Sequence, residues 1–434
     1  MSLREKIERE IRERGPIPFS RYMELCLYDP ELGYYSRAQE KFGKAGDFYT
    51  SSDVHAVFGR LLARQFEEMW RALGSPARIE VLELGPGRGL FAQDALDWSE
   101  KKFPEFYRAL HYTLDERSPS LRARLEERFR DRIEGGKVRL LGLPGSPRSS
   151  AQTEGTYQRP TGEDARHSTD KNCLRQDREG RGFSRAESTQ ENTGSGAAGV
   201  PARRRVSAPK VPLVVFANEF FDALPVEVLS EQGSLRVSTR DGRFVEEWAE
   251  ASAEELEFLD HYGVHPTQAQ RAEIALLSQR KMKEIAAAFG RGFLVVIDYG
   301  YTRDEQLAGR HLDTIMTYRQ HSASPDPYEA PGEQDITAHV NFTALAGVAE
   351  HAGMQIHKLL TQSQFLMGIG EADQFADMFE DCRVPQERAK VALQLKHLVT
   401  PSGMGETFHV LVGSKGVDPE MVSSLSGLCF GVDR

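Results

Sequence analysis

An amide and two carboxylates stand just past a short apolar run in the segment VVFANEFFDALPVEV. The apolar residues from Leu213 to Ala217 have the composition of a buried strand, and two phenylalanines are interleaved with the polar residues that follow. In open α/β sheets, binding sites form at the carboxyl ends of the strands. We therefore treat this stretch as a candidate functional site, with a capped turn beneath an aromatic lid as the alternative for Phe221 and Asp222. The candidate residues are Asn218, Glu219, Phe220, Phe221 and Asp222.

A glycine-rich turn follows another predicted strand in VLELGPGRGLF, residues 81–91. Gly85, Gly87 and Gly89 allow positive-φ turns and let a ligand approach the bare backbone. The predicted helix beyond them offers N–H donors at its N-terminus. A dinucleotide-binding loop would read G-x-G-x-x-G, but here the third glycine comes one residue early. Glu83 disfavours a diphosphate and favours a cationic ligand group, so the turn predicts a ligand site rather than an ordinary strand–helix connection.

The next predicted strand ends in two acids, in YTLDERSP. Glu116 lies 27 residues after Gly89. An acid at this place in a doubly wound sheet accepts hydrogen bonds from both hydroxyls of a ribose. The position at the strand end favours Glu116 over Asp115 for this role. An N-cap for the following helix is the alternative.

Composition restricts the classes of function. The chain has 434 residues, of which 39% are apolar and 28% charged, which is typical of a soluble globular protein. Its formal net charge of −10 argues against a general nucleic-acid binder. Its longest apolar runs are too short to span a bilayer, so we expect no membrane insertion. The four cysteines form no CxxC pair and the histidines form no HExxH motif, so we expect no metal site.

Predicted strands and helices alternate from Ile79 onward, which indicates a parallel sheet with crossover helices. The stretch 144–210 interrupts this pattern, because it holds only two aromatic residues and few aliphatic ones. We expect it to be a disordered, low-complexity insertion. Beyond it, the pattern predicts one long helix over 271–289, an irregular loop over 301–338, a last strand in TFHVLVGSKG, and a frayed tail after Gly416.

Together, the acid-flanked glycine turn, the ribose-type acid and the alternating strands resemble a class I S-adenosylmethionine-dependent methyltransferase. Further blocks resemble, in order, those of the MidA-like family, which includes the mitochondrial complex I assembly methyltransferase. The resemblance covers nearly the whole chain except the insertion and the tail. The sequence departs from the family pattern at Ser51 to Asp53, at Asn341 and in ETFHVL, and the first two departures lie near the expected substrate side. The matching blocks are YMELCLYDPELGYY, GDFYTSSDVHAVFG, LELGPGRG, ANEFFDALPVEV, IDYG, PGEQDITAHVNF and SGMGETFHVLV.

This resemblance implies an α/β fold, a class I methyltransferase with a Rossmann-like seven-stranded sheet, an N-terminal helical cap and an inserted α+β subdomain. The sheet is expected to be parallel except for an antiparallel last strand. The expected domains are the cap over 1–75, a first core part over 76–143, the insertion over 144–210, a second core part with a substrate-side subdomain over 211–416, and a tail over 417–434.

The resemblance also implies roles for individual residues. Glu219 is the candidate that orients a target arginine, because a carboxylate binds a planar guanidinium through two hydrogen bonds while aromatic rings stack on its face. Asp222 does the same or caps the next helix, and Asn218 completes the catalytic set. The expected ligands of the cofactor, S-adenosyl-L-methionine, are Glu83, Gly85, Gly87, Gly89, Glu116 and Asp47. The expected substrate-side residues are Phe220, Phe221, Asp298, Tyr299, Asp335 and His339.

The implied reaction is symmetric dimethylation of an arginine in a protein substrate, a respiratory complex I subunit in related proteins. We expect no nucleic-acid partner, and a homodimer is open. The implied location is the cytoplasm of a bacterium, or the mitochondrial matrix if the host is a eukaryote. Three alternatives stay open at this point: a small-molecule methyltransferase, a non-catalytic assembly chaperone, and a NAD-linked oxidoreductase, which the early third glycine and Glu83 disfavour.

Overall fold

The computed structural model describes residues 1–36, 56–141, 211–288, 290–319, 322–371 and 373–430. The predicted insertion over 144–210 and the predicted cofactor ligand Asp47 lie outside these ranges. Within them, each helix is too short or too polar to cross a bilayer.

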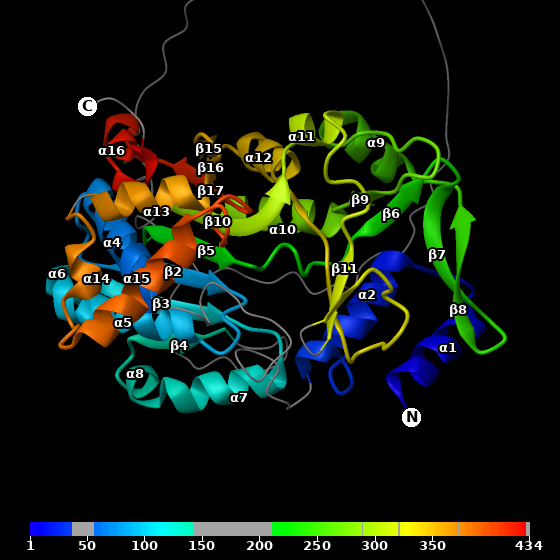
Figure 1. The fold of residues 1–434 in the computed structure, drawn as a ribbon, viewed down its shortest axis with the longest axis horizontal. Coiled ribbons are helices and arrows are strands. Elements are labelled where there is room, and N and C mark those ends of the chain that lie inside the picture. Colours follow the sequence, from blue (N-terminus) through cyan, green and yellow to red (C-terminus); the bar gives the residue numbers. More distant parts are fainter. Residues whose placement is uncertain (37–55, 142–210, 289, 320–321, 372, 431–434) are drawn as a thin grey trace, which may run out of the picture. The chain divides into compact units, whose positions relative to one another are not determined.

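The central sheet has the strand order β15-β17-β10-β5-β2-β3-β4 (Figure 1). Strands β10, β5, β2, β3 and β4 run parallel, and β17 pairs antiparallel with β10, as predicted. Two short strands, β14 and β16, pair with β10 and β17, so the sheet has nine described strands where seven were expected. At two residues each, they are too short to show a period in the sequence. The bounds are β2 Ile79–Leu84, β3 Leu110–Asp115, β4 Val138–Leu140, β5 Leu213–Asn218, β10 Gly292–Tyr301, β14 Val340–Asn341, β15 Gln355–Ile356, β16 Leu360–Thr361 and β17 Phe408–Lys415.

Both faces of the sheet are buried, which explains the nearly continuous apolar runs of its strands. In β5, Val214 and Phe216 pack into the core on one face, whereas Val215 and Ala217 pack into the core on the other. Helices α10 and α12 contribute to the second core, and the helices that contribute to the first include α4, α5 and α13. The helix bounds are α4 Ala56–Ala72, α5 Leu90–Lys102, α6 Pro104–Ala109, α7 Pro119–Arg128, α8 Arg130–Glu134, α10 Leu276–Ala288, α12 Phe342–His351, α13 Gln362–Glu371, α14 Ala376–Phe379 and α15 Pro385–Val399.

The first two helices belong to a separate apolar core. They pack there with a second sheet of order β1-β7-β6-β9, to which β8 adds through β7 (Figure 1). Helix α1 begins at a capping box in which Ser2 and Glu5 satisfy each other's backbone N–H groups. Helix α4, although within the predicted cap over 1–75, packs against α5 in the core of the central sheet. The bounds are α1 Leu3–Arg14, β1 Ile17–Pro18, α2 Phe19–Tyr28, η1 Tyr34–Ser36, β6 Glu227–Ser230, β7 Gly233–Arg240, β8 Arg243–Ala249, α9 Ala253–Tyr262 and β9 Ala272–Ile274.

Three local predictions were wrong. The helix predicted over 271–289 begins only at Leu276, because residues 272–274 form β9 and pair with β6. The predicted loop over 301–338 holds one helix and a three-stranded sheet. The predicted frayed tail packs on the core, where Val422 and Leu425 are buried. The elements concerned are α11 Arg303–Leu307, β11 Met316–Arg319, β12 Ser322–Ser324, β13 Asp335–Thr337, α16 Pro419–Ser423 and η3 Ser426–Leu428.

Candidate active site

The glycine turn after β2 has a left-handed backbone at Gly85, Gly87 and Gly89, with φ of +63°, +54° and +73°. A Cβ on Gly89 would lie 2.5 Å from Leu125 Cδ2, and a Cβ on Gly85 would lie 2.9 Å from Phe220 Cδ2. A Cβ on Gly87 would meet no described atom within 4 Å. Packing therefore explains two of the glycines, whereas Gly87 keeps an open approach to the backbone, as a ligand cradle requires.

Glu116 joins this turn to the end of β3. Its two carboxylate oxygens accept hydrogen bonds from the backbone N–H groups of Gly87, at 3.2 Å, and Ser118, at 2.8 Å. The side chain is buried, and this burial raises the pKa of Glu116 to about 7. The predicted acid is therefore in place beside the glycine turn. Its role in binding a ribose stays a prediction.

Glu83 is a second buried acid near the turn. Its Oε2 accepts a hydrogen bond from the Tyr112 hydroxyl at 2.9 Å, and burial, with a smaller contribution from the charge of Glu116, raises the pKa of Glu83 to about 8. A cationic ligand group would stabilise its charged form. The open position at Gly87 and the two desolvated carboxylates fit a cofactor that carries a ribose and positive charge.

The loop after β5 begins with a strained residue. Glu219 has φ of +48°, a left-handed conformation that is uncommon for a residue with a side chain. Its N–H continues the pairing with β10 by donating to the Ile297 carbonyl at 3.0 Å. The Asn218 Nδ2 donates to Glu219 Oε1 at 3.2 Å, and both side chains are half-buried. The amide thus orients the carboxylate at the carboxyl end of the strand.

Asp298, at the end of β10, fixes the conformation of this loop. Its Oδ2 accepts hydrogen bonds from the backbone N–H groups of Phe220, Phe221 and Asp222, at 3.2, 3.0 and 3.3 Å. The side chain is fully buried. Burial, and then the charges of Asp222 and Glu219, raise the pKa of Asp298. The structure therefore places this predicted substrate-side residue underneath the loop, where it contacts backbone N–H groups.

Asp222 and Tyr299 form a buried pair beside Asp298. The Tyr299 hydroxyl donates to Asp222 Oδ2 at 2.5 Å. Burial raises the pKa of Asp222 to about 6. Phe221 packs into the core between the sheet and helices α10 and α12. Its role on the substrate side stays a prediction. Phe220, by contrast, is half-buried and reaches Gly85.

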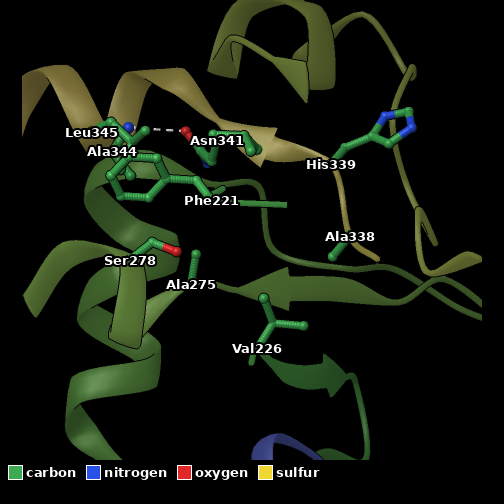
Figure 2. Close-up of a pocket in the computed structure, with 10 residues that line it drawn as sticks. Phe221, Val226, Ala275, Ser278, Ala338, His339, Asn341, Ala344 and Leu345 are labelled. Atoms are coloured by element: carbon green, nitrogen blue, oxygen red, sulfur yellow. Dashed lines mark hydrogen bonds between the residues drawn. The ribbon is translucent and has the colours of Figure 1, made fainter. Parts of the chain in front are cut away.

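Asp335 is the first residue of β13, and His339 lies between β13 and β14. Asp335 Oδ1 accepts a hydrogen bond from the Tyr35 hydroxyl at 3.0 Å. His339 Nδ1 lies 3.1 Å from His311 Nδ1, and burial together with His311 lowers the pKa of His339 to about 4. The small cavity in Figure 2 has a volume of about 10 Å³, room for about one water molecule, and the His339 ring points away from Phe221 there. His339 is thus neutral and packed against a second histidine.

Two residues that no motif singles out, Tyr28 and Ser118, also lie in this region. Tyr28, on α2, donates from its hydroxyl to the Ala223 carbonyl at 2.8 Å. Ser118 donates from its hydroxyl to the Tyr35 carbonyl at 2.6 Å. The only available signal was the unusual aromatic content of the segment around Tyr28 and Tyr35.

A family model described as "Putative S-adenosyl-L-methionine-dependent methyltransferase" matches residues 61–360. The chain is 27% identical over 433 residues to the mitochondrial protein arginine methyltransferase NDUFAF7 homolog of Drosophila melanogaster, covering 96% of this chain and 85% of that protein. It is 26% identical over 417 residues to the mitochondrial protein arginine methyltransferase NDUFAF7 of Homo sapiens, covering 92% and 80% of the two chains.

A crystal structure of a COG1565 superfamily member from Burkholderia thailandensis, bound to S-adenosyl-homocysteine, has 27% sequence identity and a TM-score of 0.69. The match covers 96% of this chain and 92% of that chain. The family model and this liganded structure confirm the predicted cofactor, S-adenosyl-L-methionine, and the predicted fold class. The chain belongs to this family of S-adenosyl-L-methionine-dependent methyltransferases.

Proposed function

We propose that this protein transfers methyl groups from S-adenosyl-L-methionine to an arginine side chain of a protein substrate. The observation that carries the proposal is the loop after β5. Asp298 holds three of its N–H groups, and Glu219 stands in a left-handed conformation at its start. Phe220, the next residue, reaches the glycine turn at Gly85. An aromatic ring is therefore held against the glycine turn, and the residue before it in the chain carries a carboxylate. The names of the NDUFAF7 relatives support arginine and a protein as the acceptor.

The chain's own residues supply position and charge. The bound cofactor supplies an electrophilic methyl group on a sulfonium. Gly87, Glu83 and Glu116 are the residues that would hold it, because the turn is open at Gly87 and both carboxylates are buried. Glu219 would accept two hydrogen bonds from the target guanidinium. This pairing localises positive charge next to the carboxylate and leaves the opposite nitrogen more nucleophilic. Catalysis then rests on orientation and electrostatics.

The test is transfer of labelled methyl from S-adenosyl-L-methionine to proteins of a lysate from a host depleted of methylation. Glu219→Gln is the matched variant, because it keeps the size of the side chain and removes its charge. We expect a labelled protein that yields dimethylarginine on digestion, and no label with the variant. Calorimetry with S-adenosylhomocysteine should give equal affinities for both proteins. Symmetric rather than asymmetric dimethylation is a further prediction, read from the same digest.

Absence of label from a protein that binds the cofactor would contradict the proposal and favour a small-molecule acceptor or a chaperone role. Label on lysine or a carboxylate would keep the methyltransferase and overturn arginine as the acceptor.

A further inference from the structure

We propose that three tyrosines and two acids form the pocket that receives the guanidinium of the target arginine, an inference that rests on the proposed function. We call this set the tyrosine–acid cage. The set lies beside the loop after β5, and it includes neither the glycine turn nor Glu219. Its members are Tyr28, Tyr35, Tyr318, Asp222 and Asp335.

Four of the cage members come from three segments of the chain that contact one another, namely the segment of Tyr28 and Tyr35, strand β11 and strand β13. The rings of Tyr28 and Tyr35 have their centroids 5.5 Å apart, and the Tyr35 hydroxyl donates to Asp335 at 3.0 Å. Tyr318 lies directly opposite Asp335 in the antiparallel pair of β11 and β13. Residues opposite each other in such a pair project from the same face of the sheet. Tyr318 and Asp335 are therefore neighbours on one face.

The fifth member, Asp222, is linked to this group by its charge and by a contact of the neighbouring residue in its loop. After burial, the charges of Asp222 and Asp335 both contribute to raising the pKa values of Tyr28, Tyr35 and Tyr318. The charges of both carboxylates therefore act on all three hydroxyls. The Tyr28 hydroxyl also donates to the carbonyl of Ala223, the residue after Asp222.

Asp222 gives an independent indication of a ligand. Its side chain is only 4% exposed, and Oδ2 is occupied by the Tyr299 hydroxyl. Within the described part of the chain, Oδ1 is buried and has no hydrogen-bond partner. A desolvated carboxylate oxygen without a donor is costly, and a cation with N–H groups removes that cost. As whole residues, Tyr28, Tyr35 and Tyr318 are half-buried, so each keeps some surface for a ligand.

The chemistry of the cage favours a guanidinium over a compact ammonium. A guanidinium is planar, stacks on aromatic faces and offers several N–H donors in one plane, which matches rings arranged around two carboxylates. The cage also borders the cofactor side. Ser118, which binds Glu116 through its N–H, donates from its hydroxyl to the Tyr35 carbonyl. A guanidinium held there would lie between the loop after β5 and the acid at the end of β3.

The test is a titration of the full chain, saturated with S-adenosylhomocysteine, with Nα-acetyl-arginine amide by ligand-observed NMR. Nα-acetyl-citrulline amide has nearly the same shape without the charge, and Nα-acetyl-lysine amide has the charge without the plane. We expect saturable binding of the arginine amide and affinities at least about tenfold lower for the other two. Asp222→Asn and Tyr318→Leu should each lower the affinity about tenfold, because one removes a charge-assisted hydrogen bond and the other a ring face. Tyr318→Phe should keep most of it.

Tyr107→Phe is the matched control, because Tyr107 is half-buried on α6, outside the cage, and also lies near a cation, that of Lys137. It should change nothing. Each variant must bind S-adenosylhomocysteine normally, which shows that it is folded. No saturable binding of the arginine amide to the parent protein, or equal affinities for Asp222→Asn and the parent, would overturn the cage.

The outcomes separate this proposal from the proposed function. If the cage binds the arginine amide but no protein is labelled in the methyl-transfer experiment, the proposed function fails and the cage stands. If Asp222→Asn methylates an arginine substrate with the KM and kcat of the parent, the cage fails and the proposed function stands. Preference for the lysine amide would overturn arginine in both.

Discussion

The backbone N–H of Gly87 donates a hydrogen bond to Glu116 Oε2 at 3.2 Å, which ties the centre of the glycine turn to the acid that ends β3. Gly87 lies three residues beyond the end of β2, and Glu116 directly follows β3. The two strands run parallel, and their last residues, Leu84 and Asp115, pair with each other. The contact shows that the glycine turn and the predicted ribose acid lie side by side in the fold. It also means that a change at either residue acts on the other.

Glu116→Gln should weaken cofactor binding in a protein that still folds but is less stable by about 1–3 kcal/mol, because the new NH₂ group faces the N–H of either Gly87 or Ser118. The amide keeps the shape of the side chain but loses the charge that strengthens hydrogen bonds to two ribose hydroxyls. We expect a loss in affinity for S-adenosylhomocysteine of about tenfold to a hundredfold, measured by calorimetry. Glu127→Gln, an exposed position on α7, serves as control and should bind like the parent. Equal affinities for Glu116→Gln and the parent would remove Glu116 from the cofactor site.

Alanine at Gly87 and at Gly89 should have opposite profiles. At Gly89 the added Cβ would press on Leu125 and Phe129, at 2.5 and 2.7 Å, so the unfolding free energy should fall by roughly 2 kcal/mol or more. At Gly87 only the left-handed backbone is strained, at about 1 kcal/mol, but the Cβ projects where we place the cofactor. Urea unfolding and calorimetry on both variants test this. A Gly87→Ala protein with normal cofactor affinity would contradict that placement.

Glycine at position 219 should give a more stable protein than alanine at the same position. Both remove the carboxylate, but glycine adopts φ of +48° without the steric cost that alanine carries, roughly 1 kcal/mol. Both should lose methyl transfer to the same extent and bind the cofactor normally. Urea unfolding combined with the labelled-methyl experiment separates backbone strain from chemistry. Transfer retained by Glu219→Gly would show that the loop conformation, not the carboxylate, is required.

Elements with a clear local sequence pattern could be predicted from that pattern alone. The apolar run before Asn218 predicted β5, and the three glycines predicted the turn that the structure shows with left-handed backbone. The parallel direction of the strands and the antiparallel last strand were expected, and the structure confirms both.

Contacts between distant segments carried no such signal. Asp298 lies 77 residues after Phe221, and only the parallel register, in which Asn218 pairs with Ile297, brings its carboxylate under the loop. The Tyr28 hydroxyl contacts the Ala223 carbonyl although the two residues are 195 positions apart, so only the tertiary fold brings them together. Strand β9 was read as part of a helix because three residues are too few to show an alternating period, and its pairing with β6 decides its conformation.

Asp298→Asn should unfold more easily than the parent and lose methyl transfer. The asparagine oxygen can accept from either the loop N–H groups or the Tyr299 N–H, but its NH₂ group then faces donors on the other side. Buried donors without acceptors cost about 1–3 kcal/mol each, so we expect a loss of roughly 2–3 kcal/mol by urea unfolding. An unchanged unfolding midpoint would show that the loop does not depend on Asp298.

Glu83→Gln should become more stable relative to the parent as pH rises. The pKa of Glu83 is about 8 in the folded protein against an ordinary value of 4.5, so below about pH 4.5 the residue carries a proton in both the folded and the unfolded state. Above that, the unfolded chain releases the proton while the folded protein keeps it. This favours unfolding by up to about 1.4 kcal/mol per pH unit until about pH 8. Glutamine does not ionise, yet its side-chain oxygen still accepts the Tyr112 hydroxyl. Urea unfolding of both proteins from about pH 5 to about pH 8 should therefore show curves that diverge in favour of the variant. Parallel curves would mean that Glu83 ionises as easily in the folded protein as in the unfolded chain.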